Sequence, residues 1–326
     1  MKTTAKEVAA LAGVSVSAVS RAFRPGASIS EDKRGRILAA ADELGYRTPS
    51  GQVISELATG TIAVVMGDVA NPFYPTVLEA LSQELFRRGR RLILHVAPKG
   101  QDVDAVMRQV LDYRADGAII TSTLLSSQLA SACRTRRMPV VLFNRTQPGS
   151  GISAVCCDNY AGGQDIGRRL VERGCRRIAF IGGLADTSTH LERRRGFYKV
   201  LSEAGLGVVH ERSGAFCYPT AYSAALDLLG ERPRPDAIFC ANDVMALAAI
   251  DAAKSLGLRA PDDLAIVGFD DIPMAAWQSY RLTTVRQRMR QMIADALDLI
   301  EQAIEDPAIE GAIRMAPGKL IVRDTG

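Results

Sequence analysis

The sequence is poor in the residues that most enzyme and metal sites use. Its 326 residues include only three histidines and one tryptophan, and the six cysteines form no CxxC pair. The histidines, His95, His190 and His210, have no partner nearby in the sequence that would complete a catalytic triad. The motifs GxGxxG after the first strand, GxxxxGK[ST], HExxH and GxSxG are also missing. The sequence therefore argues against an enzyme and predicts neither a metal ion nor a cofactor.

Long hydrophobic runs are missing as well. No segment is apolar over the length that a bilayer requires, and Lys6 and Glu7 interrupt the N-terminal stretch, which makes it a poor signal peptide. Cys156 and Cys157 are adjacent, which suits neither a disulfide between them nor a zinc site. We therefore expect a cytoplasmic protein with buried, reduced cysteines.

The charges of residues 37–326 sum to zero. Residues 1–36 contain seven Lys or Arg and three Asp or Glu, a net +4, which equals the net charge of the whole sequence. A basic segment of this size is typical of nucleic-acid binding, although a merely solvated face would look the same.

This basic segment has the pattern of a helix-turn-helix. Thr4 and Glu7 have capping-box spacing for a first helix, in which Val8, Leu11 and Ala12 form the apolar face. Gly13 is suited to end that helix. A second helix is predicted to begin at Val16 after a Ser15 cap, and a third to span about 31–44 after a Ser30 cap.

The second helix, within GVSVSAVSRAF, has a small and polar outer face. We expect Val19 to point inward, and Ser17, Ala18, Ser20 and Arg21 to point outward. Small side chains permit close approach to base edges in the major groove, and an arginine reaches a phosphate or a guanine. The alternative, a plain three-helix cap on an enzyme, explains this pattern less well.

From residue 61 onward, apolar runs of strand length alternate with helical stretches. Continuous Val, Ile and Leu runs separated by helices predict parallel sheets covered on both faces. Two rounds of the pattern indicate two lobes. The runs are TIAVVMG, RLILHVAP, GAIITS, PVVLFN, AVCCD, RIAFIGG, AIFCAN and LAIVGFDD, and the helices include 74–88, 102–114, 159–174, 190–205 and 242–256.

In this order, a series of short motifs resembles the lactose-repressor (LacI/GalR) family of bacterial transcription regulators. The motifs are KEVAALAGVSVSAVSRAF, ELGY, NPFY, DNYAGG, RRIAFIGG, RRGF, FCANDVMALAAI, VGFDD and LTTVRQ. The resemblance implies an α/β protein with an all-α headpiece at 1–47, a hinge at 48–60 and a two-lobed, periplasmic-binding-protein-like core at 61–326. It further implies that the chain crosses between the lobes three times, with 61–158 and 288–317 in one lobe and 159–287 and 318–323 in the other.

The resemblance also assigns a DNA-binding face. Ala18 and Arg24 replace the threonine and asparagine common in the family, and the hinge is atypical in Pro49 and Glu56, with Leu57 as the expected minor-groove wedge. The alternative for this stretch is a plain linker. The expected DNA-contacting residues are Thr4, Ser15, Val16, Ser17, Ala18, Ser20, Arg21, Arg24, Ser30 and Leu57.

By family position, a small-molecule effector, most simply a sugar or a sugar derivative, binds between the lobes. The expected contacts are Phe73, Tyr74, Asn144, Asp158, Thr189, Arg193, Phe216, Asn242, Asp270 and Gln287. Asp270 has a structural alternative, the N-cap of a helix at 272–279. The expected assembly is a homodimer on a near-palindromic operator, with no membrane partner. The competing functions are a sugar-binding protein and an α/β enzyme acting on sugars, each without a role on DNA.

Overall fold

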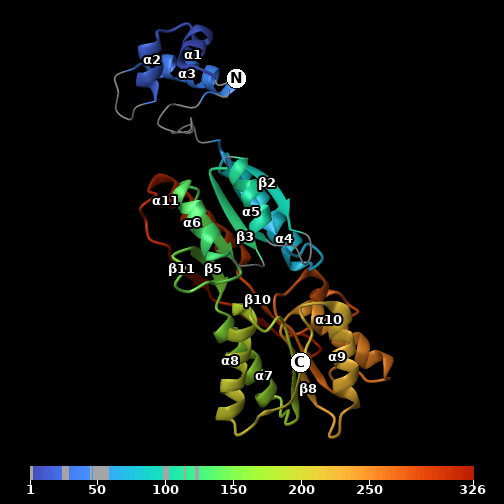
Figure 1. The fold of residues 1–326 in the computed structure, drawn as a ribbon. Helices are drawn as coiled ribbons and strands as arrows, with labels where there is room; N and C mark the ends of the chain where they lie inside the picture. The colour runs from blue at the N-terminus through green and yellow to red at the C-terminus, as the bar shows by residue number, and fades with distance from the viewer. Residues whose placement is uncertain are drawn as a thin grey trace. The chain divides into compact units, whose positions relative to one another are not determined.

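The computed structural model describes residues 3–23, 29–44, 46, 59–97, 103–113, 115–121 and 125–326. The chain divides into two compact units, Met1–Ala58 and Thr59–Gly326 (Figure 1). Within the described ranges, none of the helices combines the length and the hydrophobicity that crossing a membrane requires.

The first unit contains three helices, α1 (Ala5–Ala12), α2 (Val16–Ala22) and α3 (Glu31–Glu43). The Glu7 carboxylate accepts hydrogen bonds from the Thr4 amide at 2.7 Å and the Thr4 hydroxyl at 3.0 Å at the start of α1. Gly13 ends α1 with φ +64°, a conformation that favours glycine. Ser15 Oγ accepts from the Ala18 amide at 3.2 Å and caps α2. The turn between the helices is therefore fixed by local chemistry.

The core of this unit corrects two predictions. Ala18 is 8% exposed and packs with Val8, Val19 and Ile37, so it faces inward rather than outward. Leu11, expected in the core, is exposed, and Ala9 is buried in its place. In both cases the three-helix packing selects the smaller side chain, because alanine permits close approach of the helices.

The second unit begins with an α/β lobe. Its sheet has six strands, all parallel, in the order β11-β5-β4-β3-β1-β2. The strands are β1 (Thr61–Met66), β2 (Arg91–Val96), β3 (Gly117–Thr121), β4 (Val140–Phe143), β5 (Ser153–Cys157) and β11 (Ile313–Ala316). The helices of this lobe are α4 (Phe73–Arg87), α5 (Val103–Asp112), α6 (Ser127–Thr135) and α11 (Met289–Glu305).

The other lobe of this unit has a four-stranded parallel sheet in the order β7-β6-β8-β9. Its strands are β6 (Ile178–Gly182), β7 (Val208–Ser213), β8 (Ala237–Cys240) and β9 (Ala265–Val267), and its helices are α7 (Asn159–Glu172), α8 (Ser188–Glu203), α9 (Tyr218–Gly230) and α10 (Asp243–Ser255). A short 3-10 helix, η1, spans Pro273–Ala276. The antiparallel pair β10 (Thr284–Arg286) and β12 (Lys319–Ile321) completes the unit.

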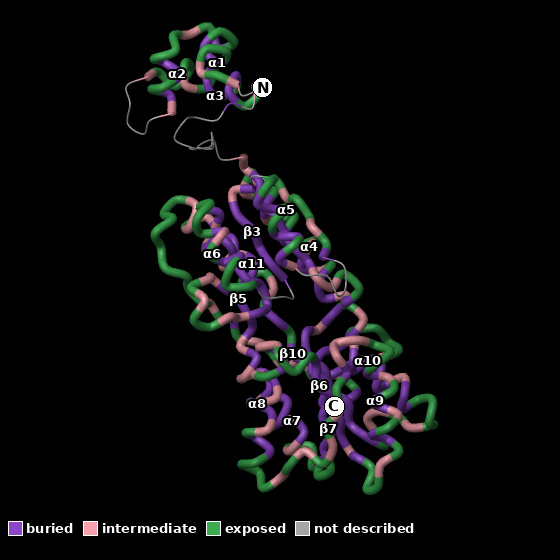
Figure 2. Tube along the Cα trace, in the orientation of Figure 1, coloured by how far each residue is buried: buried purple, intermediate pink, exposed green. Residues whose placement is uncertain are grey.

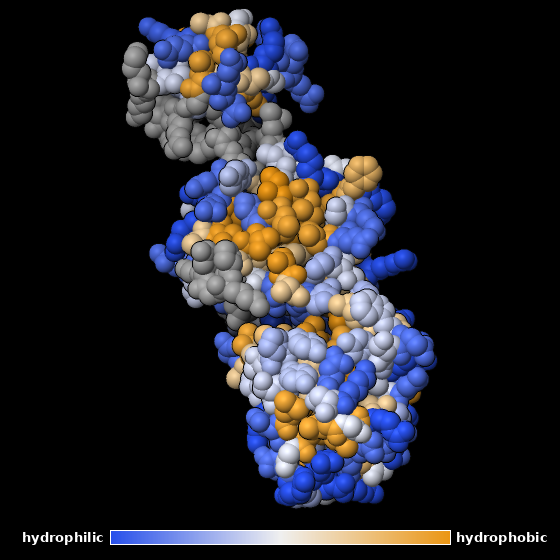
Figure 3. All heavy atoms as spheres, turned by 90° about the vertical axis from the view of Figure 1, so that its right-hand side faces the viewer, coloured by the Kyte–Doolittle hydropathy of each residue, from blue (hydrophilic) through white to orange (hydrophobic). Residues whose placement is uncertain are grey.

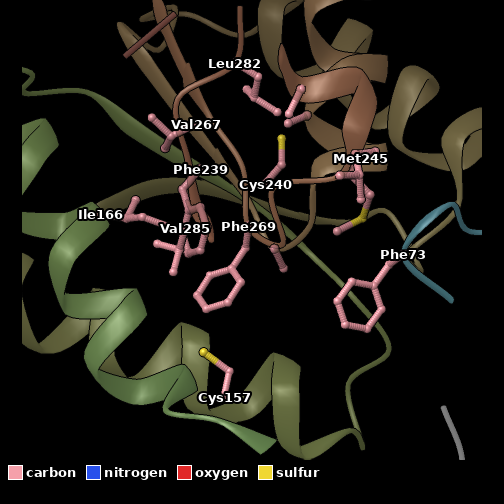
Figure 4. Packing of buried hydrophobic residues seen from close by; sticks show 14 of the residues in the cluster. Phe73, Cys157, Ile166, Phe239, Cys240, Met245, Val267, Phe269, Leu282 and Val285 are labelled. Carbon is pink, nitrogen blue, oxygen red and sulfur yellow. The ribbon is translucent and has the colours of Figure 1, made fainter. Parts of the chain in front are cut away.

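The chain passes between the lobes three times. It leaves the first sheet after β5, returns between β10 and α11, and leaves again between β11 and β12. The two lobes share one buried hydrophobic cluster, which includes Val64 of β1 and Phe180 of β6. Figure 2 shows the buried strands in the interior of each lobe, and Figure 4 shows Phe269 among side chains of this cluster that include Phe73 and Cys157. The fold class predicted from the sequence is thus the one observed.

Three details differ from the sequence expectation. β2 lies at the edge of its sheet and is largely exposed, although its apolar run predicted a strand buried on both faces. β7 was not among the predicted strands because its sequence, VVHERS, alternates rather than forming an apolar run. Of the six cysteines, all free, Cys217 is only partly buried.

Close packing of α7 against α8 depends on glycine. A Cβ atom built on Gly163 would lie 2.2 Å from the Arg193 carbonyl oxygen, which is backbone and cannot move aside easily.

We expect Gly163→Ala to lower the free energy of unfolding by about 1–3 kcal/mol, measured by urea denaturation of the full chain. Gly230→Ala, at a helical glycine with nothing within 4 Å of the added atom, is the matched control and should not destabilise. Equal effects of the two substitutions would contradict this account of the packing.

Candidate functional site

The exposed face of α2 is small and polar, with one cation. Val16 is 45% exposed, and Ser17, Ser20 and Arg21 are exposed beside it. The Ser15 and Ser17 hydroxyl oxygens lie 3.0 Å apart, so Ser15 combines its capping role with a position on this face. A helix with this surface can enter the major groove with hydroxyl groups and a guanidinium directed at base edges and phosphates.

The other predicted DNA-contacting residues fall into two groups. Thr4 and Ser30 are exposed residues that precede α1 and α3, where N–H groups favour phosphate. The Thr4 hydroxyl is bonded to Glu7, and this bond together with that of the Thr4 amide lowers the pKa of the Glu7 carboxyl. The Ser30 side chain makes no capping hydrogen bond. Arg24, Pro49, Glu56 and Leu57 lie outside the described residues.

In the second unit, the buried guanidinium of Arg193 organises the polar residues of the second lobe. Its Nε donates to Asn159 Oδ1 at 2.8 Å, its Nη1 to the Ala241 carbonyl at 2.6 Å and its Nη2 to Asp270 Oδ1 at 3.0 Å. The guanidinium carbon lies 3.7 Å from the centre of the Phe269 ring. Arg193 is 1% exposed, so its charge is compensated almost wholly by these groups.

Asp270 has a backbone conformation that favours glycine, with φ +124°. Its amide donates to the Val285 carbonyl at 2.9 Å, and its Oδ1 accepts from both Arg193 and Gln287 Nε2, the latter at 2.8 Å. Burial raises the pKa of its carboxyl, whereas Arg193 lowers it. The 3-10 helix that follows has Ile272 at its N-cap, so the capping alternative considered for Asp270 is wrong. The surrounding bonds hold a strained residue in place, as at many binding sites.

Asp243, whose carboxyl is affected by the charge of Asp270, is fully buried. Its Oδ1 lies 2.6 Å from the Thr284 hydroxyl, and its Oδ2 accepts from the Ile272 amide at 2.9 Å. Burial, reinforced by the charge of Asp270, raises the pKa of Asp243 from 3.8 to about 8. Through these two hydrogen bonds the carboxyl ties the segment after β9 to β10.

A second polar group surrounds Tyr74 at the carboxyl ends of the strands of the first lobe. Burial raises the pKa of Tyr74, and the charges of Arg145, Asp270 and Asp68 and a hydrogen bond with Asn144 also act on its hydroxyl. Phe73 lies edge-on to Tyr74, with ring centroids 5.3 Å apart. Asn144 follows β4 with φ +63°. The carboxyl ends of parallel strands are the usual place for ligands in such sheets.

Arg145 connects this group to the second lobe. Its Nη1 donates to the Thr189 hydroxyl, and its guanidinium carbon lies 5.6 Å from the centre of the Phe216 ring. The neighbouring Thr146 amide donates to Ser188 Oγ at 3.1 Å. These contacts join the segment after β4 to the first turn of α8. The two lobes are thus in polar contact where the predicted effector residues gather.

Most of the predicted effector residues lie in these two groups. Two more of them, Asp158 and Asn242, are helix N-caps, and their role toward an effector stays a prediction. Asp158 Oδ1 accepts from the Ala161 amide at 2.9 Å, and Asn242 Oδ1 from the Met245 amide at 3.0 Å. Sequence reasoning missed Asp68 and Arg145. Both follow a strand end, which is the signal that selected Asn144, and it was available for them too.

The arrangement is suited to binding rather than to reaction. Burial lowers the pKa of His190, whose Nδ1 accepts from the Gly183 amide at 3.1 Å, so its imidazole is part of the framework. Burial also raises the pKa of Cys157 to about 12, which keeps this thiol protonated and unreactive. Among the described residues, no group of His, Cys, Asp and Glu could hold a metal ion.

Comparison with known proteins assigns a family to both units. Residues 4–49 match the profile of "Bacterial regulatory proteins, lacI family", and residues 168–325 match that of a "Periplasmic binding protein-like domain". The HTH-type transcriptional repressor PurR of Proteus mirabilis is 34% identical over 314 residues, covering 93% of this chain and 92% of that protein. PurR of Photobacterium profundum is 30% identical over 98% of this chain and 97% of its own length.

Solved structures agree with this assignment. The transcriptional regulator CelR in complex with cellobiose superposes with a TM-score of 0.76 at 30% identity, over 100% of both chains. The lac repressor dimer bound to operator and the anti-inducer ONPF gives a TM-score of 0.74 at 25% identity, covering 100% of this chain and 99% of that one. The resemblance inferred from the sequence motifs is therefore confirmed at the level of family and fold.

The raised pKa of Asp243 predicts a pH-dependent stability. Because the folded-state pKa, about 8, lies above the unfolded value of 3.8, the folded state binds the proton more tightly. This contribution is complete below pH 3.8 and is lost as the pH rises through 8. Asp243→Asn mimics the protonated side chain without titrating. We expect the stability of the wild type, relative to that of this variant, to fall between about pH 5 and pH 8.5 in urea denaturation. A difference that stays constant with pH would show that Asp243 is ionised in the folded protein.

Proposed function

The chain belongs to the lacI family of bacterial regulatory proteins, and from this premise we propose that it represses transcription under the control of a sugar or a sugar derivative. The family consists of DNA-binding repressors with an effector-binding domain and is not enzymatic, so the enzyme alternative is set aside. A repressor acts on chromosomal DNA, and we place this one in the cytoplasm. The match of residues 4–49 to the DNA-binding profile also speaks against a transport protein, which would have no use for a headpiece.

The observation that carries the effector proposal is the set of buried polar atoms without partners around Tyr74 and Asp270. Among the described residues, Asp68 Oδ1, Asn144 Oδ1, Arg145 Nε and Gln287 Oε1 are buried and lack a hydrogen-bond partner. Such atoms are costly unless a ligand completes their bonding. A molecule with several hydroxyl groups would do so, with Phe73, Tyr74 and Phe216 supplying aromatic surface.

Two relatives support this choice through their own ligands. CelR was solved with cellobiose, and a LacI family regulator from Enterococcus faecium was solved with ribose at 21% identity, a level at which the likeness concerns the fold alone. We include purines in the test because they are the second class of effector that such a pocket could hold.

We further propose a homodimer that reads a near-palindromic operator through two headpieces. The lac repressor was solved as a dimer on its operator. In this chain the edge strand β2 exposes Ile93, Leu94 and Val96, and Phe86 at the end of α4 is 84% exposed. Figure 3 shows hydrophobic side chains gathered on the face of the first lobe that carries β2 and α4. An exposed apolar edge of this kind is suited to a second copy of the chain.

Control by the effector follows from the contacts between the lobes. A ligand that completes the bonding of groups on both lobes stabilises one relative arrangement over others, and it shifts the equilibrium only by its differential affinity. In this proposal, Leu57 is the minor-groove wedge, and its insertion into DNA is the step that the effector controls.

A thermal-shift screen of the full chain tests the effector proposal. Neutral sugars, sugar acids, sugar phosphates and purine bases are compared at equal concentration, since a true ligand raises the melting temperature by mass action. Stabilisation by members of the sugar classes supports the proposal. Stabilisation by purines alone would overturn it.

Arg21 is the exposed cation of α2, and its loss should weaken specific DNA binding. Arg21→Ala removes a phosphate contact or a guanine contact worth roughly 1–3 kcal/mol, so we expect a drop in affinity of about 5-fold to 150-fold. The measurement is titration of the duplex that the wild-type protein selects from a random library. Arg259→Ala, which removes an exposed charge from the other unit, is the control. Unchanged affinity in Arg21→Ala would remove Arg21 from the DNA interface.

In this proposal Asp270 binds the effector, and its replacement should separate effector binding from DNA binding. Asp270→Asn keeps an acceptor for Gln287 but removes the charge that Arg193 requires. We expect loss of the ligand-induced rise in melting temperature and retention of duplex binding, after circular dichroism has shown that the variant folds. Asp262→Asn, an exposed carboxylate, should behave like the wild type. A normal ligand response in Asp270→Asn would place the effector site elsewhere.

A further inference from the structure

Arg145 is a buried cation with one side of its guanidinium unused. It is 5% exposed and lies two residues after the end of β4. Nη1 donates to the Thr189 hydroxyl and to the Asn144 carbonyl. Nε is buried without a partner, and within the described ranges Nη2 makes no hydrogen bond. The Nε and Nη2 hydrogens point the same way and form the edge that a carboxylate binds with both oxygens.

The charge of Arg145 is also uncompensated by any ion pair within the described part of the chain. Arg193, which is buried to a similar degree, has the Asp270 carboxylate at 3.0 Å, whereas no described carboxylate lies within 4.0 Å of Arg145. The charge of Asp270 acts on Arg145 only from beyond ion-pair distance. Since a buried cation with no carboxylate bonded to it is unfavourable, the site is unfinished on this side.

Arg145 offers unused hydrogen-bond donors, whereas other side chains near Tyr74 and Asp270 offer unused acceptors. Asn144 Oδ1, Gln287 Oε1 and Asp68 Oδ1 are acceptors that lack donors. Asp270 Oδ1 already accepts two hydrogen bonds, whereas no described residue donates to its Oδ2. Hydroxyl groups on a ligand would supply the missing donors, and an anionic group would occupy the free edge of Arg145.

From these two requirements we propose that the effector is a sugar acid, with its carboxylate bound by the Nε–Nη2 edge of Arg145 and its hydroxyl groups donating to Asp68, Asn144, Asp270 and Gln287. A phosphate ester fits less well, because Asp68 and Asp270 both act electrostatically on the same Tyr74 hydroxyl and would repel a dianion. The inference rests on the proposed function and narrows its ligand class. It makes Arg145 the residue that determines specificity.

The position of Arg145 also links recognition to the contact between the lobes. Its other nitrogen bonds to Thr189 of α8, and its guanidinium faces Phe216, both in the second lobe. A carboxylate on the free edge fixes the plane of the guanidinium and hence these contacts. The charged group of the ligand thus acts on the same side chain that joins the lobes.

Matched pairs of ligands test the proposal on the full-length protein by titration calorimetry at pH 7.5. Glucose, galactose and glucose 6-phosphate are compared with glucuronate, galacturonate and gluconate. We expect at least one of the acids to bind tenfold or more tightly than its neutral parent and than the phosphate. In Arg145→Gln this advantage should disappear, so that the acid and its neutral parent bind with similar affinity. Arg168→Gln, at an exposed arginine of α7, should retain the preference for the acid.

A second measurement does not depend on finding the ligand. If Arg145 is an uncompensated buried charge, Arg145→Gln without ligand should unfold at a temperature equal to or higher than that of the wild type. A marked loss of stability would mean that the protein itself satisfies the guanidinium, and this would overturn the proposal.

The outcomes also separate this inference from the broader function. Neutral sugars or the phosphate binding as tightly as the acids would refute the sugar acid but leave a sugar effector in place. Stabilisation by purines alone in the thermal-shift screen would count against both the sugar acid and the sugar effector. Failure of all six compounds to bind in calorimetry would also count against both.

Discussion

The buried guanidinium of Arg193 is the constraint on which the second lobe depends. One side chain on α8 holds the start of α7 through Asn159, the end of β8 through Ala241 and the segment after β9 through Asp270. Removal of one partner from such a buried pair typically costs about 3–5 kcal/mol, because the other charge is left uncompensated. The three strand and helix ends are therefore held in one arrangement, and Asp270 keeps its unusual backbone conformation because of it.

This framework explains how some polar atoms can lack partners while the residues beside them are held firmly. Arg193 has its charge compensated within the protein, and Asp243 is fixed by Thr284 and the Ile272 amide. Among the described residues, Asn144, Arg145 and Gln287 each leave a buried atom without a partner, and they come from both lobes. A protein that completed every one of these bonds itself would gain stability but would have no remaining affinity for an effector.

The sequence predicted more of the fold than of the site. The helix-turn-helix and the parallel sheets were predictable because caps, turns and hydrophobic period are local properties. Ala18 and Leu11 were assigned to the wrong faces because the packing of three short helices, rather than the period of one, decides which small side chain is buried. β2 carries an apolar run like a central strand, and only the strand order shows that it lies at an edge.

The site shows the same limit in another form. Family position selected Asp158 and Asn242 together with Asp270, because all three follow strands, yet the first two cap helices and the third does not. Whether a polar residue at a strand end caps a helix depends on which backbone amides lie within reach of its side chain. Arg145 and Asp68 were missed although they have the same sequence signal. What distinguishes them is the lack of a partner, and that becomes visible only when all their neighbours are in place.

The missing partners also bear on how the effector can act at all. An effector with equal affinity for the two arrangements of the lobes would bind without shifting the equilibrium between them. The residues with unsatisfied atoms belong to different lobes: Asn144 and Arg145 follow β4, whereas Gln287 is bonded to Asp270 of the second lobe. A ligand that completes both sets has its full affinity only when they face each other at the right distance. In the function proposed above, the same unsatisfied bonds would give the site its affinity and the effector its control over the lobes, and through them over DNA.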